Sequence, residues 1–142
     1  MPMKKTLFKK EGRVKKEIEP LFPGYVFIES YISSLEFQRR TGYVISSSND
    51  ILRLLQYGDE DDIAMREGEK IALLNLLNDD HCIEPSLGII EGDQVCIKDG
   101  PLVGWESKLK KIDRHKRQAL IDIEVMGYQM RINAALEIVQ KI

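Results

Sequence analysis

Hydrophobic and polar residues alternate along the C-terminal third of the chain. From Ala119 to Val125 every second residue is alanine, isoleucine or valine. A period of two is typical of strands that bury one face. Residues that favour turns separate the alternating stretches, at Asp99-Gly100-Pro101, at His115-Lys116 and at Gly127. This pattern predicts a small antiparallel β-barrel.

The N-terminal half contains further candidates for strands. Residues 3–19 predict a β-hairpin whose turn is Glu11-Gly12, because glycine there permits the backbone of a tight turn. Tyr25–Ile28 is aromatic and β-branched, which favours a strand. Ile51–Leu55 predicts a short buried strand, and the following residues 58–62 predict a solvated acidic loop.

Two segments predict helices. Ser33 and Glu36 have the spacing of a capping box, so a helix should begin at about Ser34, run to Arg40 and end at Gly42. A second helix is expected over Glu67–Leu77, where five leucine and isoleucine residues form a broad apolar face. Residues 79–90 contain turn-forming residues and predict a linker.

The chain has 142 residues and a formal net charge of −2, but its charges are strongly segregated. Residues 1–20 have seven basic and three acidic side chains, a net of +4. Residues 50–93 have three basic and twelve acidic side chains, a net of −9. Residues 108–117 have six basic and one acidic side chain, a net of +5. A basic stretch can be a solvated face or a site for an anionic partner, and both interpretations remain open for these two.

No arrangement of residues indicates catalysis. Cys82 and Cys96 lack the spacing of a zinc site or a disulfide framework, which fits a reducing cytoplasm. The adjacent pair His81-Cys82 is a weak candidate for a nucleophile and its base. The glycines of residues 100–104 lack the lysine of a phosphate-binding loop. We therefore expect no enzyme activity, cofactor or metal, and no apolar run approaches the ~18–20 residues that span a membrane.

Two motifs resemble those of a known family. The segment from Leu21 to Ile28, with sequence Leu-Phe-Pro-Gly-Tyr-Val-Phe-Ile, resembles the signature strand of the NusG N-terminal (NGN) domain. Residues 91–102 followed by 109–113 resemble the KOW motif that opens the C-terminal barrel of NusG proteins, and residues 136–139 resemble its closing strand. Together they cover most of the chain in the family's order.

The resemblance implies an α+β fold in two parts. We expect residues 1–78 to form a partial NGN domain, an incomplete α/β sandwich of helices on an antiparallel sheet. Residues 79–90 would be the linker, and residues 91–142 a five-stranded, SH3-like KOW barrel. Some NusG paralogues fold this region as a helical hairpin, but the alternation described above favours strands.

The family resemblance also implies binding partners, and the residues expected to contact them are those at the matching positions of this sequence. NGN domains bind the clamp of RNA polymerase, and the matching residues here are Phe22, Pro23 and Tyr25, whose rings could alternatively belong to the core. The family's barrel contacts ribosomal protein NusE or the termination factor Rho through an apolar patch. The positions that match this patch are Leu102, Trp105 and Met126, and we expect Trp105 and Met126 to be exposed.

The basic segment near the end of the chain resembles the LoaP-type branch of the family, whose barrel binds an RNA hairpin in the nascent transcript. Leu109 and Ile112 should point into the barrel and the basic side chains outward. The residues expected to contact RNA are Lys108, Lys110, Lys111, Arg114, His115, Lys116 and Arg117.

The sequence departs from the family pattern in three places. The first strand and helix of the NGN domain do not precede Met1, so we expect an N-terminally truncated domain whose exposed sheet is distorted or completed by a partner chain, as in a strand-swapped oligomer. Ser107 occupies a position where the KOW motif usually has glycine. The region from Gly42 to Asp50 lacks the usual Pro-Gly.

These observations predict a cytoplasmic transcription elongation and antitermination factor that binds RNA polymerase and nascent RNA or a partner protein. The alternative is a ribosome-associated or transcription–translation bridging protein, whose barrel binds protein only.

Overall fold

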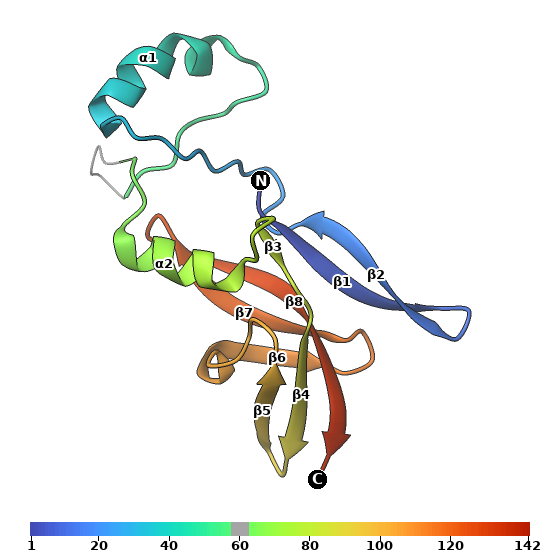
Figure 1. The fold of residues 1–142 in the computed structure, drawn as a ribbon. Coiled ribbons are helices and arrows are strands. Elements are labelled where there is room, and N and C mark those ends of the chain that lie inside the picture. Colours follow the sequence, from blue (N-terminus) through green and yellow to red (C-terminus); the bar gives the residue numbers. More distant parts are fainter. Residues whose placement is uncertain (58–62) are drawn as a thin grey trace.

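The computed structural model describes residues 1–57 and 63–142, which form an α+β fold with one three-stranded and one five-stranded sheet (Figure 1). The elements, in chain order, are β1 (Met3–Lys10), β2 (Arg13–Pro20), α1 (Ser34–Ser47), α2 (Glu67–Leu76), β3 (Cys82–Ile83), β4 (Ser86–Glu91), β5 (Gln94–Asp99), the 3₁₀ turn η1 (Glu106–Lys108), β6 (Leu109–Asp113), β7 (Gln118–Val125) and β8 (Tyr128–Lys141). The expected acidic loop at residues 58–62 lies outside the described residues.

The N-terminal hairpin is confirmed. β1 and β2 pair antiparallel from Met3 opposite Pro20 to Lys10 opposite Arg13. The turn residues Glu11 and Gly12 both have positive φ, 55° and 77°, as a tight two-residue hairpin turn requires. β1 also pairs in parallel with β3, which gives the sheet order β2-β1-β3.

The C-terminal strands form the predicted five-stranded sheet, with order β5-β4-β8-β7-β6. Ala119, Ile121, Ile123 and Val125 of β7 are all buried, so the alternation seen in the sequence marks the core-facing side. The expectation of a wholly antiparallel barrel is wrong in one respect, because β4 and β8 run parallel. β5 and β6 are the two edges of this sheet, so the SH3-like barrel is open.

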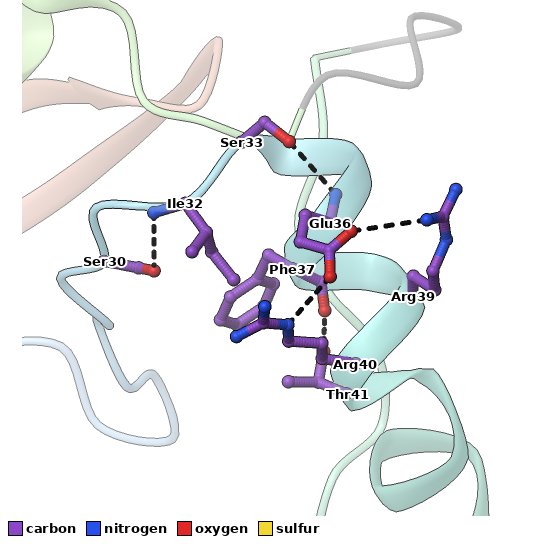
Figure 2. A network of polar contacts seen from close by, with 8 residues as sticks. All are labelled: Ser30, Ile32, Ser33, Glu36, Phe37, Arg39, Arg40 and Thr41. Carbon is purple, nitrogen blue, oxygen red and sulfur yellow. Dashed lines mark hydrogen bonds and ion pairs between the residues drawn. The ribbon is translucent and has the colours of Figure 1, made fainter.

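Helix α1 begins as predicted but ends later. The Ser33 hydroxyl accepts a hydrogen bond from the Glu36 amide at 3.2 Å, and the Glu36 carboxylate pairs with Arg39 and Arg40 (Figure 2). The predicted stop at Gly42 is wrong, because Gly42 does not adopt the left-handed backbone of a helix end. The hydrogen-bond ladder instead continues to the Ser48 amide, which donates to Val44.

Two predicted strands are absent from the described residues. Tyr25–Ile28 and Ile51–Leu55 have irregular backbone, and Val26 and Leu52 are 69% and 97% exposed. A strand is stable only where a neighbouring strand accepts its hydrogen bonds, and neither segment lies in either sheet. Most of their β-branched and aliphatic side chains therefore contribute to an exposed surface, whereas Phe27 and Leu55 pack against the core.

A single hydrophobic core extends across both halves of the chain. Helix α2, predicted for this region, buries Leu73 and Leu76. These leucines belong to the same cluster as Phe22 and Tyr57 and as the barrel residues. The segment 79–90 contains β3 and most of β4, and its Ile83 is fully buried in this cluster.

The turn between β5 and η1 is packed closely against the start of β4. Gly100 has φ +100°, and a Cβ atom there would lie 2.5 Å from the Ser86 hydroxyl oxygen. That buried hydroxyl accepts a hydrogen bond from the Leu102 amide at 3.1 Å. Ser107 lies in η1 without a positive φ, so the 3₁₀ turn makes the bend for which KOW motifs usually use glycine.

Candidate nucleic-acid and protein interfaces

The seven basic residues predicted to contact RNA lie together around β6 and its turn into β7, and are called here the basic edge. All of them are exposed except Arg117, which is half-buried. Leu109 and Ile112 pack against the core, as predicted. The β6–β7 register shifts between Leu109 and Lys111, so Lys110 is an extra residue in β6. In a regular strand, two consecutive side chains point to opposite faces. The bulge instead leaves both Lys110 and Lys111 exposed.

The turn of the basic edge has a fixed shape. The Asp113 carboxylate accepts a hydrogen bond from the Lys116 amide at 2.9 Å, and this bond, together with the nearby positive charges, holds the pKa of Asp113 below its usual value. Arg117 has φ +53°, and its carbonyl accepts a hydrogen bond from the Leu136 amide of β8 at 3.0 Å. The Arg117 guanidinium lies 3.8 Å from the Glu137 carboxylate.

The residues expected to contact RNA polymerase form a tight turn. The Tyr25 amide donates to the Phe22 carbonyl at 3.0 Å, and Gly24 between them has φ +85°. Phe22 is buried, with its ring centroid 5.5 Å from that of Phe27. Pro23 is exposed, and Tyr25 is 41% exposed. The sequence left open whether these residues belong to the core or to a binding surface. In the structure Phe22 belongs to the core, whereas Pro23 and Tyr25 are accessible.

The chain that follows this turn, residues 26–52, exposes many apolar side chains, which the sequence did not predict. Helix α1 contains no buried residue. The C-terminal half of α1 and the segment 51–56 line a shallow cavity of about 410 Å³. The exposed apolar side chains of this region are Val26, Ile28, Tyr31, Leu35, Tyr43, Val44, Ile51 and Leu52. Composition gave no signal for this surface, because apolar residues are about as frequent in 25–52 as in the whole chain, and both Tyr25–Ile28 and Ile51–Leu55 had been predicted as strands.

The expected apolar patch of the barrel is mostly covered. Leu102 is fully buried and Met126 is 6% exposed, so the expected exposure of Met126 is not found. Trp105 is half-buried, and it packs against the edge of the core. Of the three positions, Trp105 therefore offers the most accessible surface.

Glu69 of α2 holds the turn that contains Met126. Its carboxylate accepts hydrogen bonds from the Met126 and Gly127 amides, at 2.7 and 3.1 Å, and thereby holds the β7–β8 turn. Tyr57 donates its hydroxyl to the same carboxylate at 2.8 Å and accepts a hydrogen bond from the Arg66 amide. Burial is the main cause that raises the pKa of Tyr57. Sequence reasoning missed this contact because Glu69 and Met126 are far apart along the chain.

The comparison with protein families agrees with the motif resemblance. The family model described as "Transcription termination factor nusG" matches residues 1–74, which is more than half of the chain. The chain belongs to the NusG family. This membership gives the chain a general role in transcription elongation or termination, and RNA polymerase is the family's partner. NusG-family proteins are non-catalytic transcription factors. No curated protein matches the chain.

The family match ends before the barrel, so the basic edge and Trp105 lie outside it. Across residues 1–57 and 63–142, no helix has the length and hydrophobicity needed to cross a membrane. Among these residues, no three His, Cys, Asp or Glu side chains are grouped to hold a metal ion.

The hydrogen bond between Asp113 and Lys116 predicts a pH dependence of the turn. Because folding lowers the pKa of Asp113, the stabilisation is present above the unfolded value of about 3.9 and is lost as the pH falls through the folded value. We expect the chemical shift of the Lys116 amide proton to titrate with a midpoint below about 3.9. In Asp113→Asn this titration should disappear. A midpoint at or above the ordinary aspartate value would contradict the role of Asp113 in the turn.

Proposed function

We propose that this NusG-family chain is a transcription elongation and antitermination factor of the LoaP type. In this proposal, Pro23 and Tyr25 contact the clamp of RNA polymerase, with Phe22 anchoring their turn in the core. The basic edge of the barrel binds a hairpin in the nascent RNA. Residues 1–78 act as a partial NGN domain and residues 91–142 as a KOW domain, joined through residues 79–90.

The observation that supports RNA binding most strongly is the geometry of the basic edge. Phosphates are contacted by cationic side chains that face solvent, and a fixed backbone holds such side chains in a defined arrangement. The β6 bulge exposes Lys110 and Lys111 together, and the Asp113 hydrogen bond fixes the turn that presents Arg114 and Lys116. A nascent RNA and a polymerase surface bound by one chain are kept at a high effective concentration, which would favour continued association during elongation.

The alternative is that the barrel binds only protein, as in a ribosome-associated or transcription–translation bridging factor that contacts NusE, or a factor that contacts Rho. Trp105 supports this alternative, because a partly exposed tryptophan is a frequent anchor of protein interfaces. The two functions are separated by the RNA-binding experiment below.

Binding to polymerase is tested with two tyrosines of similar exposure. Tyr25 is 41% exposed in the turn, and Tyr128 is 43% exposed on the barrel. Tyr25→Ala should weaken binding to purified core RNA polymerase roughly tenfold, because truncating an aromatic anchor typically costs more than about 1 kcal/mol. Tyr128→Ala should leave the affinity unchanged. Equal affinities of the two variants, measured by fluorescence anisotropy, would contradict the assignment of Tyr25.

RNA binding is tested by replacing Lys110, Lys111 and Arg114 with alanine. We expect affinity for an RNA hairpin with a stem of roughly 16 base pairs to fall, with a salt dependence shallower by about 2–3 in the log–log slope. The matched control replaces three exposed lysines elsewhere: Lys70, Lys98 and Lys141. Unchanged RNA affinity in the first variant, together with failure of Trp105→Ala to bind a partner protein, would support the protein-only alternative.

A further inference from the structure

The tip of the β1–β2 hairpin is a second concentration of positive charge, which the proposed RNA-binding site does not include. Residues 9–16 contain five basic side chains and one acidic side chain, a net of +4. The basic residues are Lys9, Lys10, Arg13, Lys15 and Lys16, and all five are exposed. Among the described residues, the ion pairs found do not involve any of these five.

The strand register distributes these cations over both faces of the hairpin. Lys10 lies opposite Arg13, and Lys15 lies opposite Phe8, on one face. Lys9 and Lys16 lie on the other face. Like charges directly opposite one another, as in the Lys10–Arg13 pair, destabilise a hairpin. A polyanion bound at the tip would remove this repulsion, whereas the free hairpin must tolerate it.

The base of the hairpin is held firmly, in contrast to its tip. Lys5 pairs with Glu84 at 2.6 Å, and this contact raises the pKa of Lys5 and lowers that of Glu84. Met3 and Lys4 pair with β3, and the Leu21 amide donates to the Pro2 carbonyl at 2.9 Å. The hairpin is therefore a short arm anchored to the body of the protein, with an ion pair at its base and a group of exposed cations at its tip.

The basic arm and the basic edge are both attached to β8. Strand β1 packs against β8. On the basic edge, Arg117 accepts a backbone hydrogen bond from Leu136 of β8 and pairs with Glu137. In Figure 1 the tip of the hairpin and the β6–β7 turn both extend to the right of β8. Two cationic segments, with net charges of +4 and +5, thus belong to elements that contact the same strand.

The chemistry of the tip fits the phosphates of a duplex better than single-stranded bases. Proteins that bind single strands stack bases on exposed aromatic rings, but residues 9–16 contain no aromatic side chain and the neighbouring Phe8 is half-buried. Lysines and arginines without aromatic partners bind phosphates, which a folded RNA stem presents on both sides of each groove. The hairpin tip and the basic edge can contact such a stem at two places.

We infer that the tip of the β1–β2 hairpin is a second RNA contact, which binds phosphates of the same RNA stem that the basic edge binds. This inference rests on the proposed function, because it assigns a second contact to the same RNA ligand. The affinity for the RNA stem then depends on the charges of both the hairpin tip and the basic edge. Neutralising either one weakens binding, while the other still contacts the stem.

The test measures binding of the full chain to an RNA hairpin with a stem of roughly 16 base pairs, at several salt concentrations. The variant K10Q/R13Q/K15Q removes three cations from one face while keeping polar side chains on exposed strands. We expect affinity to fall about tenfold or more. The log–log salt slope should become shallower by about 2–3, because each phosphate that the protein neutralises adds about 0.7–0.9 to it. The control is K70Q/K98Q/K141Q, which should bind like the unmodified chain.

A second variant, K9Q/K16Q, removes charge from the opposite face and guards against misfolding of the first. It should also weaken binding, and both variants should keep the fluorescence of Trp105. If both hairpin variants bind RNA normally while replacement of Lys110, Lys111 and Arg114 abolishes binding, the inference is wrong and the proposed function stands. If neither set of changes affects RNA binding, the proposed function fails as well. Hairpin variants that bind duplex DNA more weakly but bind RNA normally would overturn the inference in favour of a DNA contact.

Discussion

The packing of α2 against the open barrel is the contact on which the rest of the structure depends. The barrel's edge strands β5 and β6 are not joined to each other, so its core needs cover from outside the sheet. Leu73 and Leu76 of α2 supply apolar side chains to this core. The Glu69 carboxylate then fixes the helix to the β7–β8 turn through two backbone amides. Apolar burial gives this contact its strength, and the charge-assisted hydrogen bonds give it a defined orientation.

This contact separates the surfaces proposed for different partners. Strand β7 begins next to the basic edge and ends next to Met126. Glu69 therefore binds the end of β7 that lies away from the basic edge. Met126 is buried in the core that α2 shares with the barrel, whereas Lys110, Lys111 and Arg114 are exposed. In the proposed function, an RNA stem therefore binds without disturbing α2, whereas a protein that uses Met126 would have to open the core that α2 shares with the barrel.

Local sequence signals predicted the elements whose stability is largely local. The Glu11-Gly12 turn requires a positive φ at both residues, which glycine accepts readily, and the hairpin formed around it. The alternation in β7 identified its buried face because one face of the sheet packs on the core. The bulge at Lys110 was not predicted, although the inward positions of Leu109 and Ile112 were.

Predictions failed where the outcome depends on distant partners. Tyr25–Ile28 has the composition of a strand, but no strand lies beside it in either sheet. Gly42 has the freedom to end a helix, yet the helical hydrogen bonds continue past it. The Met126 amide is bound by Glu69, a residue 57 positions away, and no local pattern encodes that contact. Side-chain exposure was therefore predicted best on the basic edge, where charge is a local property, and least well on the apolar patch.

The most direct test of the shared core uses Trp105, the single tryptophan of the chain, as a reporter of barrel unfolding. Leu76 of α2 is 1% exposed, and Leu74 on the same helix is 46% exposed. Leu76→Ala should lower the free energy of unfolding, followed by Trp105 fluorescence in urea, by about 2–5 kcal/mol. Leu74→Ala should lower it by less than about 1 kcal/mol. A Trp105 transition that is unchanged by Leu76→Ala would show that the barrel folds without α2 and would contradict the account.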